Sequence, residues 1–162
     1  MKKKLKIGIL INNYSIPNWA FKTIEQINNS YYSEIVLVVK NNSKNKKTPF
    51  FKKINSKLKS ILYVLYRKLD RIMYKNKISA FNLKDIRTIV KTPEIVINPI
   101  QSKFRDSIPA EYIKSIKNYR VDIFLRLGFR ILTGDILKIS NYGVWSFHHG
   151  DNDVNRGGPP GV

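Results

Sequence analysis

Short apolar runs alternate along this chain with segments in which apolar residues recur every three or four positions. An apolar run between polar turns is typical of a buried strand, and the three- and four-residue spacing is typical of an amphipathic helix. The pattern predicts strands over residues 4–11, 34–39, 94–98, 122–127 and 143–148. It predicts helices over residues 17–28, 109–118 and 132–139, and a longer one that begins at residue 50. This alternation predicts an α/β fold with an open, doubly wound, mainly parallel, Rossmann-like sheet.

The first strand, first helix and second strand form the clearest unit of the pattern. Residues 4–11 are rich in Ile and Leu, as expected of a buried parallel strand, and Pro17 suits the start of the helix. The residues expected on one face of that helix are Trp19, Ala20, Thr23, Ile24 and Ile27. The loop after the first strand is where such sheets usually bind ligands. It has no GxGxxG pattern, so no dinucleotide site is predicted.

Residues 40–77 differ in kind from the rest of the chain. They carry 13 basic residues and one acidic residue, so +12 of the net charge of +19 lies here. From Phe50 onward, gaps of three and four predict one apolar stripe on a long basic helix, with these members: Phe51, Ile54, Leu58, Ile61, Leu62, Leu65, Leu69, Ile72 and Met73. The stripe could pack on the domain and leave the lysines in solvent. Residues 50–77 could instead contact nucleic acid or an anionic membrane surface.

Length and composition narrow the class of protein. The 162 residues suffice for one domain with a sizeable core, and no second domain is predicted. The chain has no cysteine, which excludes disulfides and thiolate metal sites. The apolar run at residues 4–11 is too short to span a membrane and no small-residue cleavage pattern follows it, so a cytoplasmic protein is predicted. The net charge of +19 favours anionic partners or phosphorylated substrates.

Candidate chemistry lies at the end of the chain. Both histidines, His148 and His149, follow the last predicted strand, and imidazole titrates near neutral pH. On a strand that runs to His148, alternation places Ser146 and His148 on one face. Asp151, Asn152 and Asp153 follow, and we interpret them as a turn with Asx hydrogen bonds, so no metal site is predicted.

These residues resemble the signature of the folate-dependent formyltransferase superfamily, which includes methionyl-tRNA formyltransferase and the sugar N-formyltransferases. That signature is a strand carrying Asn-x-His, then a loop ending in Arg/Lys-Gly-x-x-Pro. Here His148 takes the histidine position, and Arg156, Gly157 and Pro160 match the end of the loop. Ser146 stands where the family has Asn, and Asp153 where it has a mid-loop proline.

The resemblance implies transfer of a formyl group from 10-formyltetrahydrofolate to an amine acceptor, such as an amino sugar or a sugar nucleotide, which could be phosphorylated. His148 would polarise the formyl oxygen or relay the proton, and Ser146 would donate a hydrogen bond. The residues that would border the folate pocket are Gly128, Phe129, Arg130, Ile131 and Leu132. The residues that would contact the acceptor are His149, Asn152, Arg156 and Gly157.

The resemblance covers residues 121–162 well and residues 4–40 loosely. It implies one formyltransferase-like N-terminal domain over residues 1–162, with residues 41–77 as a basic helical insertion. After the turn at residues 128–130, the short helix over residues 132–139 is expected to be capped by Thr133. The family's catalytic Asp lies beyond this loop, so we expect a C-terminally incomplete domain with little activity of its own. The alternative is a non-catalytic protein that binds RNA or an anionic membrane on a degenerate formyltransferase scaffold. The sequence leaves the acceptor and the oligomeric state open.

Overall fold

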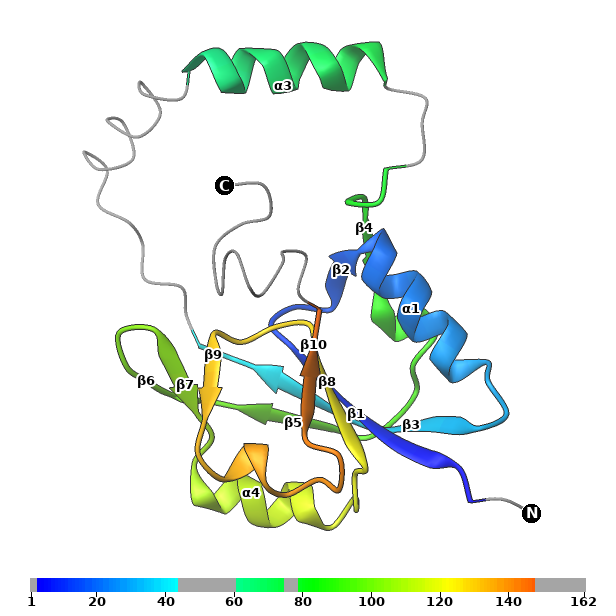
Figure 1. The fold of residues 1–162 in the computed structure, drawn as a ribbon, viewed down its shortest axis with the longest axis vertical. Helices are drawn as coiled ribbons and strands as arrows, with labels where there is room; N and C mark the ends of the chain where they lie inside the picture. The colour runs from blue at the N-terminus through cyan, green and yellow to red at the C-terminus, as the bar shows by residue number, and fades with distance from the viewer. Residues whose placement is uncertain (1–2, 44–60, 75–78, 148–162) are drawn as a thin grey trace.

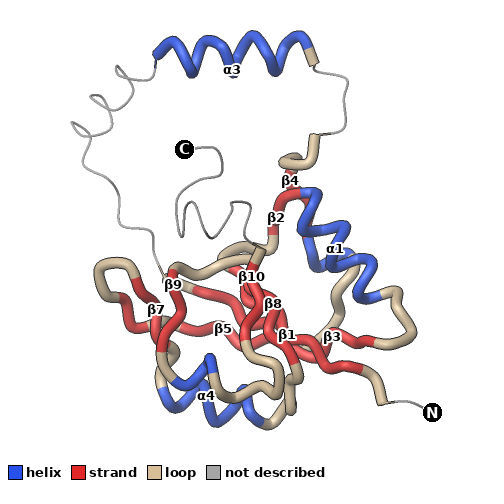
Figure 2. Tube along the Cα trace, viewed as in Figure 1, coloured by secondary structure: helices blue, strands red, loops and turns tan. Residues whose placement is uncertain are grey.

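The computed structural model describes residues 3–43, 61–74 and 79–147 (Figure 1). Within these residues, the central sheet has five parallel strands in the order β10-β8-β1-β3-β5, shown in red in Figure 2. The strands are β1 (Leu5–Ile11), β3 (Ser33–Asn41), β5 (Glu94–Ile97), β8 (Ile123–Arg126) and β10 (Val144–Ser146). Each lies where the hydrophobic pattern predicts a strand, and the predicted parallel α/β sheet is confirmed.

Helices α1 (Asn18–Asn28) and α4 (Ala110–Lys117) cover opposite faces of this sheet. Each begins directly after a proline, which fixes the backbone for entry into the helix. On α1, Ala20 and Ile24 are buried against the sheet, so the predicted buried face is confirmed at its centre. Phe21, which was not predicted on this face, is buried as well. Strands that feed helices to both faces make the fold compatible with a Rossmann-like core.

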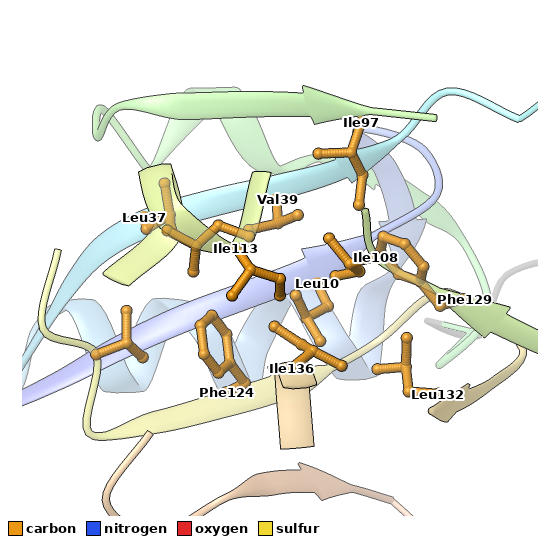
Figure 3. Packing of buried hydrophobic residues seen from close by; sticks show 12 residues of the cluster. Leu10, Leu37, Val39, Ile97, Ile108, Ile113, Phe124, Phe129, Leu132 and Ile136 are labelled. Carbon is orange, nitrogen blue, oxygen red and sulfur yellow. The ribbon is translucent and has the colours of Figure 1, made fainter. Parts of the chain in front are cut away.

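The hydrophobic core lies in two layers because side chains alternate along the buried strands. In β1, Ile9 and Ile11 belong to the cluster under α1, whereas Leu10 belongs to the cluster under α4. Figure 3 shows this second cluster, with Ile113 of α4 beside Leu10 and Phe124. All three side chains are buried.

Two small sheets flank the central one. Strands β2 (Ser15–Pro17) and β4 (Leu83–Asp85) pair antiparallel, and the 3-10 helix η1 (Ile86–Thr88) follows them. The other sheet joins β6 (Ile100–Gln101), β7 (Arg105–Ser107) and β9 (Ile131–Thr133). The hydrophobic pattern predicts none of these strands, which are only two or three residues long.

The predicted short helix over residues 132–139 is wrong in its first half. Leu132 and Thr133 lie in strand β9, which pairs with β7, so Thr133 is not a helix cap. Gly134, with φ +84°, turns the chain into the 3-10 helix η2 (Asp135–Leu137). The backbone partners that β7 offers favour a strand here, and a single-sequence pattern cannot reveal such partners.

Helix α3 (Ile61–Met73) lies within the predicted long basic helix, whose residues 50–60 and 75–77 are outside the described residues. Figure 1 draws α3 apart from the sheet. Its apolar residues Leu62, Leu65, Leu69 and Ile72 are 80%, 53%, 60% and 62% exposed. Within the described residues, the stripe is therefore exposed and does not pack on the domain.

The described residues contain no helix with the length and apolar character needed to cross a membrane.

Asp122 joins three parts of the fold at the amino-terminal edge of the sheet. Its carboxylate accepts hydrogen bonds from the backbone N–H of Lys6 (2.9 Å) and the side-chain amide of Asn141 (2.7 Å). These bonds, that from Lys6 first, hold the pKa of Asp122 below its ordinary value of 3.8. A lowered pKa in the folded state stabilises the protein above the unfolded-state pKa, and this contribution is lost as pH falls through the folded-state pKa.

We expect Asp122→Asn to lower the free energy of unfolding near neutral pH but to have little effect in strong acid. In asparagine one carboxylate oxygen becomes an NH2 group, which faces a donor at Lys6 or Asn141. Urea unfolding of both proteins, followed by circular dichroism from about pH 6 to about pH 2, measures the difference. A difference in unfolding free energy that stays constant over this range would contradict the prediction.

Candidate active site at the carboxyl edge of the sheet

The strand order places a ligand site at one point of the sheet. From β1 the chain crosses by way of α1 to β3 on one side, whereas β8 and β10 lie on the other side of β1. The loops that leave β1 and β8 therefore diverge at the carboxyl ends of these strands. In open α/β sheets, ligands bind in the crevice that such a reversal opens.

A pocket of about 300 Å³ lies at this point. It is lined by Asn12, Trp19, Arg126, Leu127, Gly128, Phe129, Ser146 and Phe147. These residues come from the ends of β1, β8 and β10 and from the first turn of α1. The pocket thus collects residues from four separate elements.

The turn after β8 packs directly on the end of β1 and forms one wall of the pocket. The backbone N–H of Phe129 donates to the side-chain oxygen of Asn12 at 2.8 Å. Asn41, at the end of β3, donates to the same oxygen at 3.2 Å. A Cβ on Gly128 would lie 2.4 Å from the backbone nitrogen of Asn12, so only glycine allows this approach.

Arg130 anchors this turn from the other side. Its Nε and Nη2 donate to Oδ1 of Asp106 at 3.0 and 2.7 Å, and its backbone N–H donates to Oδ2 at 2.8 Å. Asp106 is fully buried. The remaining N–H groups donate to the carbonyls of Ser102, Lys103 and Arg105, so all five guanidinium donors have acceptors. The Arg130 side chain therefore fixes the turn to the β6–β7 hairpin.

Arg126 and Ser146 are neighbours at the carboxyl ends of β8 and β10, where they pair in register. Nη1 of Arg126 donates to the carbonyl of Arg130 at 2.7 Å, which holds the guanidinium beside the pocket. Within the described part of the chain, Arg126 forms no ion pair, and no carboxylate lines the pocket. The described lining is therefore cationic and suits a ligand with an anionic or developing negative charge.

Two aromatic rings close another side of the pocket. The rings of Trp19 and Phe147 meet edge to face, with centroids 5.0 Å apart. Both residues line the pocket, so it combines aromatic surface with a cation and a hydroxyl. Flat, partly polar ligands favour such a combination.

The structure brings together three of the residues predicted to form the site: Ser146, Gly128 and Phe129. Arg130, Ile131 and Leu132 do not line this pocket: the Arg130 side chain pairs with Asp106, Ile131 is exposed and Leu132 is buried. The other predicted site residues, His148, His149, Asn152, Arg156 and Gly157, lie outside the described residues.

The last predicted strand is shorter than expected. Within the described residues it ends at Ser146, which pairs with Arg126, the last residue of β8. Phe147 follows the strand, and both it and Ser146 line the pocket.

Sequence reasoning missed Asn12, Trp19, Leu127 and Phe147 as pocket residues. Asn12 had a usable signal, because it directly follows the first strand, where α/β sheets place ligands. The ring of Trp19 was expected in the core, and it lies at the boundary between core and pocket.

No group of three or more potential metal ligands (His, Cys, Asp or Glu) gathers within residues 3–43, 61–74 and 79–147. In comparisons with known proteins, no family model, curated protein or solved structure matches this chain.

Proposed function

We propose that this chain is a formyltransferase-like domain that binds 10-formyltetrahydrofolate and takes part in transfer of its formyl group to an amine. One observation supports the proposal most. The turn that resembles the border of the folate pocket and the strand that resembles the Asn-x-His strand are separate in sequence, yet Gly128, Phe129 and Ser146 line one pocket. That pocket lies where open α/β sheets bind ligands.

The reaction would form one bond and break another. The amine nitrogen attacks the formyl carbon and a tetrahedral oxyanion forms. The bond from that carbon to N10 of the folate then breaks, and the proton from the amine leaves with tetrahydrofolate. In this proposal His148 relays the proton or polarises the formyl oxygen, and Ser146 donates a hydrogen bond to the oxyanion. Arg126, held beside Ser146, adds positive charge where negative charge develops.

The other residues have roles in binding. The aromatic rings of Trp19 and Phe147 offer a surface for the pterin ring, beside the turn at Gly128. His149, Asn152, Arg156 and Gly157 contact the acceptor, and the guanidinium of Arg156 suits a phosphate on an amino sugar or sugar nucleotide. We place the reaction in the cytoplasm and take residues 41–77, which include α3, as a basic helical insertion in the formyltransferase-like domain.

Tryptophan fluorescence can test whether the pocket binds folate. The chain has two tryptophans; Trp19 lines the pocket, whereas Trp145 is 57% exposed and does not line it. We expect titration with 10-formyltetrahydrofolate to quench the emission. In the matched variants, Trp145→Phe should keep the quench and Trp19→Phe should lose it. No quench in the native chain, or a quench carried by Trp145, would contradict the proposed folate site.

Turnover tests the chemistry separately from binding. With 10-formyltetrahydrofolate and a panel of amino sugars and nucleotide-linked amino sugars, release of tetrahydrofolate reports formyl transfer. His148→Ala should reduce even the low kcat expected of this domain by about a hundredfold or more, because it removes the general acid–base group. The same variant should leave folate binding to the pocket in place. Unchanged kcat in His148→Ala would contradict the role proposed for this residue.

Ser146→Asn is the informative partner to that variant. It restores the residue that the formyltransferase signature carries, and an amide reaches further than a hydroxyl. If the pocket works as proposed, Ser146→Asn should keep or raise kcat, whereas Ser146→Ala should lower it.

A further inference from the structure

Helix α3 presents an apolar face that no part of the described chain covers. At 100° per residue, one arc of the helix holds Ile61, Leu62, Leu65, Leu69, Ile72 and Met73, which we call the apolar face of α3. Each of these side chains is at least 53% exposed. A contiguous apolar patch of this kind on a soluble domain marks a surface that contacts another molecule.

The rest of α3 holds three basic residues and one acidic residue, together with Tyr63, Val64 and Tyr66. Arg67, Lys68, Asp70 and Arg71 lie off the apolar face, and the described side chains of the first three are exposed. The sequence continues this charge on both sides, since residues 40–77 hold 13 basic residues and one acidic residue. The helix therefore combines an apolar face with a net charge of +2, within a segment of residues 40–77 whose net charge is +12.

A helix of 13 residues is marginal by itself in water, so a partner that covers its apolar face stabilises it. Charge decides among three possible partners. A second copy of the chain would bring two strongly basic segments together. RNA would satisfy the charge but not the six apolar side chains, and α3 has no regular aromatic platform for bases. An anionic bilayer surface satisfies both, because it has anionic headgroups above an apolar interior.

We propose that α3 docks this protein on an anionic lipid bilayer. The helix lies in the plane of the interface, with Leu62, Leu65 and Leu69 directed into the boundary between headgroups and acyl chains. Arg67 and Lys68 reach the lipid phosphates along their flexible stems. The proposal rests on the apolar face of α3 and on the charge of residues 40–77, and it does not depend on the chemistry of the pocket.

Flotation of the full chain with vesicles tests this proposal. We expect the chain to float with vesicles of phosphatidylcholine mixed with phosphatidylserine, much less with phosphatidylcholine alone, and less as salt is added. Leu69→Gln removes a side chain from the apolar face without a change of charge and keeps a good helix former. It should reduce partitioning by about tenfold, as expected for loss of one buried leucine.

Tyr63→Gln is the matched control. Tyr63 lies on the same helix, away from the apolar face, and is 60% exposed, like Leu69. It should change partitioning by less than about threefold, within the range of a surface substitution. Both positions are exposed, so the domain should fold normally in each variant, which circular dichroism checks.

Four outcomes would overturn the proposal. The first is absence of flotation with the anionic vesicles. The second is equal partitioning of Leu69→Gln and Tyr63→Gln, because purely electrostatic adsorption does not distinguish the two faces. The third is dimerisation in light scattering that Leu69→Gln abolishes, without flotation. The fourth is salt-sensitive binding to single-stranded RNA, without flotation.

Discussion

Replacing Arg130 with methionine is expected to lower the free energy of unfolding by about 3 kcal/mol or more. The substitution leaves the Asp106 carboxylate, which is fully buried, without the guanidinium that donates to it at 2.7 and 3.0 Å. It also removes the donors to the carbonyls of Ser102, Lys103 and Arg105. A buried charge without its partner is far more costly than a lost surface contact. Urea unfolding followed by circular dichroism measures the effect.

The matched control is Arg87→Met. Arg87 also pairs with an aspartate, Asp85, but its side chain is 62% exposed, so water replaces the lost contact. We expect little change in unfolding free energy from this variant. The double variant Arg130→Met with Asp106→Leu removes both charges and should recover part of the loss. If Arg130→Met were as stable as Arg87→Met, the ion pair to Asp106 would not stabilise the turn beside the pocket.

The central sheet could be predicted from sequence because local pattern and tertiary structure agree there. The apolar runs at β1 and β3 are long and continuous, as strands buried on both faces require. Helices α1 and α4 carry their apolar residues at helical spacing and begin after prolines, so the sequence also predicts where they start.

The flanking strands could not be predicted, because their residues do not specify them locally. β9 is a three-residue strand whose partner, β7, lies 26 residues earlier in the chain, as in the pairing of Asp106 with Leu132. The buried Asp106 that holds this region together is a polar residue in a mainly polar segment. No sequence pattern around Asp106 indicates that it pairs with Arg130.

The candidate site was predictable only in part, because some of its residues are brought together by contacts between distant segments of the chain. Ser146 and Gly128 were singled out because their segments resemble the formyltransferase signature. Asn12 contributes through a hydrogen bond to Phe129, which is 117 positions away in the chain. Such a contact follows from the strand order, and the sequence pattern gives the strands but not the order in which they pair.

Gly128→Ala is expected to lower the free energy of unfolding by about 3 kcal/mol. It is also expected to weaken ligand binding in the pocket of the protein that remains folded. The new methyl group would lie 2.4, 2.6 and 2.9 Å from backbone atoms at Asn12 and Ile11. Backbone at the end of β1 cannot move aside without breaking the sheet, so the turn must move instead. That movement breaks the hydrogen bond from Phe129 to Asn12 and widens the pocket.

Variants at two other glycines serve as controls that separate the effect on stability from the effect on ligand binding. In Gly143→Ala the added Cβ meets nothing within 4 Å, so only the φ of +76° is strained, at a cost of about 1 kcal/mol. In Gly8→Ala the Cβ meets the ring of Phe124 at 2.5 Å, in the core and away from the pocket. We therefore expect Gly8→Ala to destabilise the domain but to keep the fluorescence quench by 10-formyltetrahydrofolate at a temperature where it remains folded. Gly128→Ala, under the same condition, should lose the quench. Equal folate binding by the two folded variants would contradict this prediction. It would mean that the close approach of Gly128 to Asn12 is needed for the fold but not for folate binding.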